Sequence, residues 1–536
     1  AELKDAEGKT IETEVIVDNA NKITIIPKTD VDNGVLVVRG KRERGQSPFS
    51  IAMEYLTRIS TGLQNVNFSY NEDRGSILNG YKEEANYFLG SNKGFAAPGW
   101  AYLFGLTDEE FINRVLDNHW MSSNIDESIV NPYTLTYAKR FTLKATIEPL
   151  SDLQITLDWM HNSTSNDTKQ YYAIDGVFQQ VDGQYVYYNR QSQGNFTHSF
   201  NAIRTSFQKV SNKTYRSEAI ENFMEYRKIV AWELARYRAV NHQGYDPGTD
   251  FEGYPIGYTE NSPDVLRSAF KAAFEGTDPK NFEKGPGKIV PAILAAAPNW
   301  RIDYKGLSKI KAINKYFRNV TLTHAYVSNY SIGSYQSNPD YIAGPDGFSD
   351  IMNIEGTYFI PEFVANSVSF QESFNPLTGV NLTWKNGMNS GVNFKKDRNV
   401  ALNLTNSTLT EIRSWDFTIR SGYTIKDVPL VFKTKSGGQR KFVSNVNITG
   451  DFSIRDNVTY NHQLALNETD LSSTNVSERI AGKTNYAFKI GADYQLSKNL
   501  NVRAFYEHTI DNPVVSTYFR TVRAKFGFTV NYRLSE

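Results

Sequence analysis

The stretch that most constrains the fold lies near the end of the chain, where TVRAKFGFTVNYRL runs from Thr521 to Leu534. Apolar and polar residues alternate over its fourteen positions, whereas a soluble strand has about 5–6 residues. A strand that crosses a bilayer needs about 9–11 tilted residues with one apolar side toward lipid. The stretch therefore predicts a membrane-crossing strand, and its lipid-facing side chains are expected to be Val522, Ala524, Phe526, Phe528, Val530, Tyr532 and Leu534.

Composition agrees with a barrel but does not require one. The chain has 536 residues, a mean hydropathy of −0.48, and 58 basic against 58 acidic side chains, so no net charge attracts nucleic acid. Its most apolar run, Ile289 to Pro298, is too short for a spanning helix of about 20 residues. In a barrel, polar lumen-facing residues offset the lipid-facing ones in any hydropathy average. The 32 Tyr and 32 Phe suit interfacial girdles, and they would equally suit a secreted β-sandwich.

The first residues, AELKDAEGKTIETE, are polar and charged, unlike a signal peptide. The chain is therefore expected to be mature, truncated, or one fragment of something longer. Soon after, ITIIP and VLVVRG flank DVDNG, which predicts a hairpin with Asn33-Gly34 at its turn. TDEEFINRVLDNHW predicts a short helix with Thr107 as its N-cap.

The clearest hairpin runs from Tyr133 to His161 and turns tightly at PLSD. A long polar segment, Asn162 to Gln193, is expected to be a loop at the opposite end. Short turns at one end and long loops at the other are typical of outer-membrane barrels. With the closely spaced alternating segments that follow residue 313, the sequence predicts about fourteen to sixteen strands.

Between the strand regions the pattern changes to helical spacing. Helices are predicted over Ser217 to Val240 and over Ser262 to Gly276, the second with Pro263 at its first position. The whole chain is thus divided into three regions. Residues 1–208 contain the initial barrel strands, long loops and a short helix, residues 209–312 a helical or irregular insert, and residues 313–536 the closely spaced C-terminal strands. The insert is expected to be extramembrane or lumenal. The fold class is thus an all-β, antiparallel outer-membrane barrel with a helical insert.

Catalytic motifs are absent from the sequence. The seven His are scattered, there is no Cys, no HExxH and no GxSxG, and EKGPGK lacks P-loop spacing. We therefore predict no enzyme, cofactor or metal. Two acidic loops remain open as Ca²⁺ ligands or as solvated loop acids: Asp246, Asp250 and Glu252, and Asp340, Asp346 and Asp350. Asn-x-Thr matches are interpreted as a hydrated lumen face, not as glycosylation sites, at Asn319, Asn381, Asn403, Asn447 and Asn457.

A free sheet edge is energetically unfavourable in lipid. Each unpaired backbone group costs several kcal/mol there, and an edge of about ten residues exposes roughly five such groups. We therefore expect this chain to close on itself or to be completed by strands of another polypeptide.

Two long segments carry a family resemblance. Asn299 to Asn338 and Phe370 to Val428 closely resemble the C-terminal region of the SprA/Sov proteins, the outer-membrane translocons of the type IX secretion system that are linked to gliding motility. GFAAPGWAYLFG and RFTLKATIEPL resemble upstream blocks of the same region. Members of that family are several times longer and form an exceptionally large single-chain barrel, so this chain resembles their C-terminal part.

The resemblance implies a multi-pass outer-membrane protein that passes folded cargo to the cell surface. It also implies partners: the N-terminal remainder of the barrel, a PorV-type cargo-shuttle barrel, a periplasmic plug protein, secreted cargo and the lipid bilayer, with energy from an inner-membrane proton-driven motor. Lys525, Gly527, Val530 and Tyr532 resemble the β-signal that barrel-assembly machinery recognises on a terminal strand. Leu534-Ser535-Glu536 follows them in place of the usual terminal aromatic residue.

Two other functions stay open on the sequence. A TonB-dependent nutrient transporter would need a plug domain and a TonB box, and neither is visible. A secreted β-rich adhesin or carbohydrate-binding protein would also be rich in alternating strands.

Overall fold

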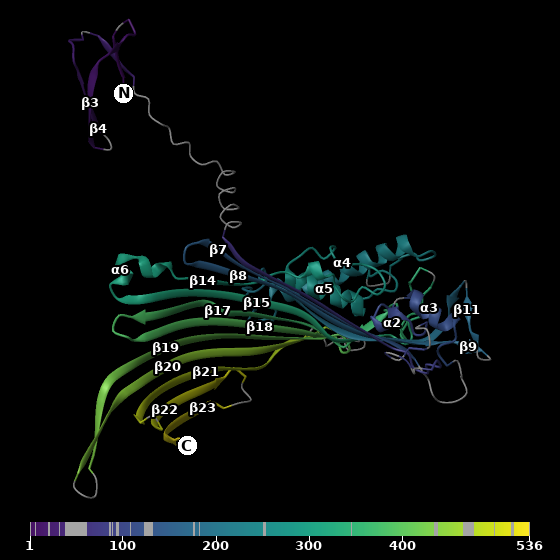
Figure 1. Ribbon diagram of the computed structural model, residues 1–536. Coiled ribbons are helices and arrows are strands. Elements are labelled where there is room, and N and C mark those ends of the chain that lie inside the picture. Colours follow the sequence, from purple (N-terminus) through teal and green to yellow (C-terminus); the bar gives the residue numbers. More distant parts are fainter. Residues whose placement is uncertain are drawn as a thin grey trace. The chain divides into compact units, whose positions relative to one another are not determined.

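The computed structural model divides the chain into two compact units, Ala1–Thr61 and Gly62–Glu536 (Figure 1). No helix in the described part of the chain is long and apolar enough to cross a membrane. The description covers residues 2–37 and 62–534, with gaps at 6, 20–21, 32, 85–86, 88, 90, 93–95, 108, 123–131, 175–176, 182, 250–252, 345, 434–437, 465–475, 498 and 516–518.

The described residues of the first unit form five short strands in two small sheets. β1 (Glu2–Asp5) pairs with β2 (Thr10–Ile11) and β5 (Gly34–Val37), and β3 (Thr13–Asn19) pairs with β4 (Lys22–Pro27). The hairpin predicted across DVDNG is therefore wrong, because β4 turns back on β3. The connection between β3 and β4 is shorter than the one across DVDNG, which lowers the entropy cost of closing it.

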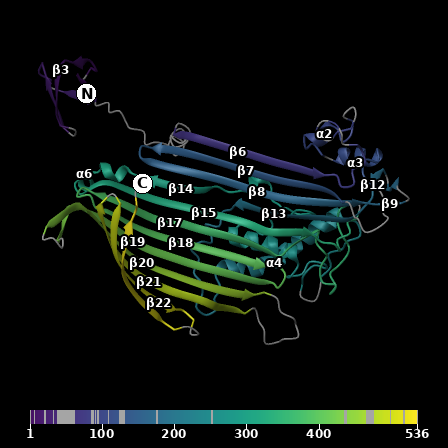
Figure 2. The same ribbon diagram turned by 60° about the horizontal axis from the view of Figure 1, so that its bottom comes forward.

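The second unit is built on one antiparallel sheet of fourteen strands, which confirms the predicted all-β, antiparallel class (Figures 1 and 2). The described residues form twenty-three strands in all, more than the fourteen to sixteen predicted, and the other nine are short strands of the first unit and of the connection before β13. Its order is β23-β22-β21-β20-β19-β18-β17-β15-β13-β8-β7-β6, with β14 and β16 paired beside this path. The strands are β6 (Leu63–Ile77), β7 (Tyr133–Leu150), β8 (Leu153–Tyr171), β13 (Tyr187–Ser199), β14 (Asn299–Tyr304), β15 (Phe317–Ser337), β16 (Phe363–Ala365), β17 (Ser367–Trp384), β18 (Asn389–Asn403), β19 (Thr408–Lys433), β20 (Gln439–Gln463), β21 (Ser477–Ser497), β22 (Leu500–Pro513) and β23 (Thr521–Tyr532).

The connections differ strongly between the two ends of this sheet. Short connections, 151–152, 385–388, 434–438 and 498–499, lie at one end, which we call the short-turn end, together with one longer connection at 305–316. The opposite, long-loop end carries 78–132, 172–186, 338–362 and 464–476, together with shorter connections at 404–407 and 514–520. The asymmetry predicted from the first hairpin therefore extends across the sheet.

The long polar segment expected as a loop at Asn162 to Gln193 is mostly strand instead. β8 continues to Tyr171 and β13 begins at Tyr187, and the two pair throughout this stretch. Polarity misled the prediction, because polar side chains do not prevent a segment from pairing as a strand with neighbours on both sides. Only the small strands β9 (Ala173–Ile174), β10 (Val177–Phe178), β11 (Gln180–Val181) and β12 (Gln184–Tyr185) lie between them.

The loop before β7 contains two helices, α2 (Trp100–Leu103) and α3 (Glu109–Asp117). The helix predicted from TDEEFINRVLDNHW is thus present, while residue 108 beside Thr107 and part of GFAAPGW lie outside the described residues. Phe111, Val115 and Leu116 of α3 pack with Phe178 in a small buried cluster at the long-loop end.

Between β8 and β15, one strand position of the sheet is shared by two strands, β13 and β14. β13 pairs with the far half of β8, from His161 onward, and β14 pairs with the near half, Leu153 to Asp158. Both also pair with β15, so β14 continues the line of β13. The insert therefore occupies residues 200–298 and leaves the sheet in the middle of a strand, whereas the helical or irregular insert was expected over 209–312, a range that includes β14.

The insert carries the two predicted helices, α4 (Glu218–Asn241) and α5 (Pro263–Glu275). Ser262 occupies the N-cap position of α5, and Gly276 ends it in the left-handed region with φ of 70°. Three short elements follow: η2 (Ile293–Ala295), η3 (Gly306–Lys309) and α6 (Lys311–Asn314). Figure 1 shows α6 and α4/α5 toward opposite ends of the strands.

Candidate functional site: two faces of the sheet and a strap

The registers assign every paired residue to one of two faces, because directly opposite residues in antiparallel strands point the same way. One row across five strands is Ile419, Phe452, Phe488, His508 and Ala524. We call this side the apolar face and the other the polar face.

The apolar face is open to its surroundings near the short-turn end. Nine of its large side chains in β19 to β22 are between 36 and 45% exposed, so no second layer covers them in the described part of the chain: Trp415, Ile419, Tyr423, Ile425, Phe452, Tyr486, Phe488, Ile490 and Tyr506. Over the rows from Phe417 to Ile425, the apolar face of β17 to β23 holds no Asp, Glu, Lys or Arg. This band is suited to contact with hydrocarbon.

The polar face carries the charges of the same strands. Opposite charges pair across it, for example Arg420 with Asp451 at 3.4 Å and Lys489 with Glu507 at 3.5 Å. All five asparagines of the Asn-x-Thr matches lie on this face. A face of this kind is suited to water.

The terminal strand follows the same division. Val522, Ala524, Phe526, Phe528, Val530 and Tyr532 lie on the apolar face and are exposed. The side chain of Leu534 is 82% exposed and lies beyond the end of β23, and residues 535–536 are outside the described chain.

The four β-signal positions divide between the two faces. Val530 and Tyr532 lie on the apolar face, and Lys525 and Gly527 on the polar face, where Gly527 is directly opposite Phe505. A Cβ at Gly527 would come within 2.8 Å of the Phe505 ring, and Lys525 Nζ lies 5.3 Å from the centroid of that ring. The glycine thus leaves room for a neighbouring ring.

The insert packs against the apolar face at the long-loop end. Its helices contribute Phe223, Phe270 and Phe274 to the main buried cluster, and the sheet contributes Tyr330, Ile332, Val368, Phe370, Val400, Leu402 and Leu409. These sheet residues lie on the apolar face, and the charged rows of Lys396 and Arg398 separate them from the uncharged band. Nothing in the sequence predicts this placement, because apolar side chains are expected both under a helix and in contact with lipid.

The first part of the insert, Phe200 to Arg216, crosses the apolar face from strand to strand, and we call it the strap. Its backbone and side-chain groups form hydrogen bonds with side chains of five strands. Ala202 N–H donates to Tyr326 of β15 at 2.9 Å, Ser206 Oγ donates to Glu372 of β17 at 2.5 Å, and Arg216 Nε donates to Ser477 of β21 at 3.0 Å. The carbonyls of Ser206 and Gln208 accept from Lys396 of β18 at 2.7 Å and from Arg413 of β19 at 2.6 Å.

An ion pair lies under the strap. The Arg398 and Glu372 side chains are each 2% exposed, and Arg398 Nη2 lies 3.0 Å from Glu372 Oε2. Arg398 also donates to Thr205 O at 3.1 Å and to Thr205 Oγ1 at 2.9 Å. Because buried charges need partners, the pair and the strap stabilise one another.

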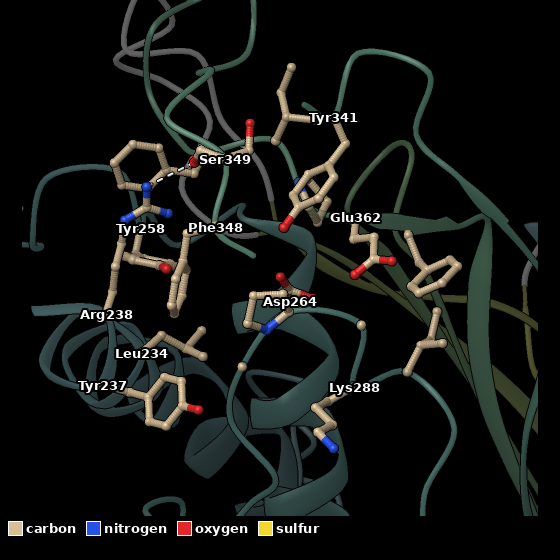
Figure 3. Close-up of a pocket in the computed structure, with 18 of the residues that line it drawn as sticks. Leu234, Tyr237, Arg238, Tyr258, Asp264, Lys288, Tyr341, Phe348, Ser349 and Glu362 are labelled. Atoms are coloured by element: carbon tan, nitrogen blue, oxygen red, sulfur yellow. Dashed lines mark hydrogen bonds between the residues drawn. The ribbon is translucent and has the colours of Figure 1, made fainter. Parts of the chain in front are cut away.

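A pocket lies within the insert, between α4, α5 and the loops 285–289 and 341–363 (Figure 3). The cavity is only about 60 Å³, enough for a few water molecules and too small for a substrate. Burial raises the pKa of Tyr258, one of its lining residues, to about 12 and raises the pKa of Glu362. A second, more open hollow of about 350 Å³ lies between α5, Phe196 and Tyr330.

The buried guanidinium of Arg238 borders the first pocket. It lies 3.7 Å from the ring centroid of Phe359 and donates to Ser349 O at 2.8 Å and to Asp350 Oδ1 at 2.6 Å. His242 joins the same network through Nδ1 to Asp346 at 2.5 Å and Nε2 to Asp350 at 2.8 Å.

Two of the acids considered as Ca²⁺ ligands therefore serve as partners of α4. The hydrogen bond with His242 lowers the pKa of Asp346. Asp250 and Glu252 lie outside the described residues, and no group of three or more metal-ligating side chains occurs among those described.

Comparisons with known proteins complete the description. No protein-family model and no curated protein sequence matches the chain. Among solved structures it is similar to OmpT (in-vitro folded), an outer membrane protein of Vibrio cholerae in its trimer form, with 9% identity over 87% of this chain and 98% of that one and a TM-score of 0.19. At that TM-score the likeness carries no argument, and the fold assignment rests on the strands and registers described above.

Proposed function

We propose that this chain forms part of the wall of a protein-conducting outer-membrane translocon of the type IX secretion system. The proposal combines the resemblance of Asn299 to Asn338 and of Phe370 to Val428 to SprA/Sov proteins with the chemistry of the sheet. The apolar face would contact lipid, and the polar face would line a hydrated passage for folded cargo.

The observation that carries the proposal is the continuous division between the two faces. Phe417 to Ile425 spans eight residue steps of about 3.3 Å, or roughly 26 Å along the strand, which gives about 20 Å of height at the usual barrel tilt. That height is somewhat less than the roughly 25 Å apolar band of outer-membrane barrels. The sheet is also a single layer there, which favours a membrane wall over a soluble adhesin.

The edges of the sheet favour a larger assembly. Among the described residues, β6 pairs only with β7 and β23 only with β22, so both outer edges carry unpaired backbone groups. In lipid such edges cost tens of kcal/mol together, by the several kcal/mol per unpaired group. In the proposed assembly, the remainder of a SprA/Sov-type barrel would pair with these edges.

The partners follow from the same proposal. A PorV-type barrel would collect cargo, a periplasmic plug protein would close the passage, and a proton-driven motor would provide energy. A TonB-dependent nutrient transporter remains the alternative within membrane proteins, and an adhesin or carbohydrate-binding protein the alternative outside them.

The test is purification of the natural protein from its membrane in mild detergent. We expect this chain to be recovered with further barrel strands, either within one longer polypeptide or as a second strand-rich chain, and with a PorV-like barrel. It should also show heat-modifiable migration. Recovery as a soluble protein without detergent would favour the adhesin, and recovery with a TonB-type energy-coupling protein would favour the nutrient transporter.

A further inference from the structure

The strap lies at the margin between the apolar band and the helical insert. The row just beyond the band contains Lys396, Trp415 and Asp456, and Lys396 donates directly to the strap carbonyl of Ser206. The strap therefore borders the uncharged band on the side away from the short-turn end, where a bilayer around the apolar face would place its headgroups.

The strap is basic. It contains Arg204, Lys209, Lys213 and Arg216, and residues 200–217 include no Asp or Glu. Arg204, Lys209 and Lys213 are exposed and form no ion pair within the described part of the chain, although Arg204 donates to Gly276 O at 3.0 Å. Three uncompensated cations thus lie along the border of an uncharged band.

An aromatic side chain accompanies these cations. Phe207 is 54% exposed, and its ring centroid lies 5.2 Å from that of Phe374. Lys396 Nζ lies 4.2 Å from the centroid of the Phe207 ring. Aromatic rings beside Lys and Arg are typical of the bilayer interface, where the ring enters the acyl boundary and the cation reaches the headgroups.

We propose that the strap binds the phosphate-bearing headgroups of anionic lipids in the leaflet at the long-loop end. The inference rests on the proposed function, because it requires the apolar face to contact lipid. It adds a specific partner and specific residues: the headgroup phosphates pair with Arg204, Lys209 and Lys213, while Phe207 enters the acyl boundary. Each cation near an anionic surface contributes to binding, and salt screens that contribution.

The experiment uses the complete protein in nanodiscs of phosphatidylcholine with 20% phosphatidylglycerol. This chain has no Cys, so one fluorophore can be attached at Phe207→Cys, and a second sample carries it at Phe452→Cys on the apolar band. Quenching is measured with nitroxides on the headgroup or deep in the acyl chain. We expect the label at position 207 to be quenched more by the headgroup nitroxide, and the label at position 452 more by the deep one.

Lipid selectivity is measured with headgroup-labelled phosphatidylglycerol against headgroup-labelled phosphatidylcholine at equal mole fraction. We expect at least threefold stronger quenching at position 207 by the anionic lipid, falling to parity in Arg204→Gln/Lys209→Gln/Lys213→Gln. The matched control is Arg420→Gln/Lys489→Gln/Arg503→Gln, which removes three exposed cations from the polar face. This control should keep the preference for the anionic lipid.

The outcomes separate the two proposals. If neither label is quenched by lipid, the apolar face does not contact hydrocarbon and the proposed function fails with it. If only position 452 is quenched, or if the anionic preference is absent or survives the strap variant, the wall stands and the strap inference is overturned. Loss of the preference at a few millimolar inorganic phosphate, but not at equal ionic strength of chloride, would replace the lipid by a free-phosphate site and also overturn it.

Discussion

Replacing Arg398 with Met should release the strap from the sheet. The guanidinium and the Glu372 carboxylate are each 2% exposed, so the variant leaves a buried charge without its cation. Breaking a buried pair in this way costs about 3–5 kcal/mol. Glu372 retains the hydroxyl donors of Ser206 and Tyr326, so we place the cost near 3 kcal/mol, at the lower end of that range.

The assay is thiol labelling of Ala202→Cys, because Ala202 is a fully buried residue of the strap. If labelling requires opening of the strap, a destabilisation of the closed strap by about 3 kcal/mol accelerates labelling roughly 100-fold, since each 1.4 kcal/mol changes the opening equilibrium tenfold. Arg398→Met/Glu372→Leu should recover most of the protection, since no buried charge remains. Arg420→Met, which removes an exposed ion pair, should change the rate by no more than about fivefold. An acceleration by Arg398→Met no larger than that of the control would refute the reasoning.

Two further predictions use neighbouring or paired residues. Phe452→Arg places a charge in the apolar band and should destabilise the membrane-assembled protein by about 2–4 kcal/mol, while Ser453→Arg on the polar face should have little effect. The two variants are compared by their denaturant midpoints in vesicles. Equal losses of stability would contradict the assignment of faces. The lowered pKa of Asp346 means that its contact with His242 stabilises the folded state fully above about pH 4 and less as the pH falls through the lowered pKa. The protection factors for hydrogen exchange in the loop 338–362, which correct for the intrinsic pH dependence of the exchange rate, should therefore fall on acidification in the natural protein and change less in Asp346→Asn. An identical acid response in both would count against the contact.

The parts of the fold that depend on local pattern could be predicted from the sequence. Alternation over Tyr133 to His161 and over β23 identified strands, and Ser262-Pro263 with Gly276 marked the ends of α5. These signals act over a few residues, where side-chain periodicity and capping chemistry determine the conformation.

The parts that depend on distant pairing could not be predicted. β14 has only six residues, and it completes the column of β13 from the far side of a 99-residue insert, as counted from 200 to 298. No local property of NWRIDY specifies β8 and β15 as its neighbours. Likewise, Arg398 and Glu372 appear in the sequence as ordinary alternating strand residues, and only the strap reveals why both charges are tolerated in a buried position.

The directions of the two edge strands impose an arithmetic condition on any closed wall. β6 starts at the short-turn end and β23 finishes there, so the two edges run in opposite directions. In an all-antiparallel ring directions alternate, and strands added between these edges must therefore be even in number. A single donated strand would satisfy one edge and meet the other in parallel, so completion of this wall proceeds in hairpins.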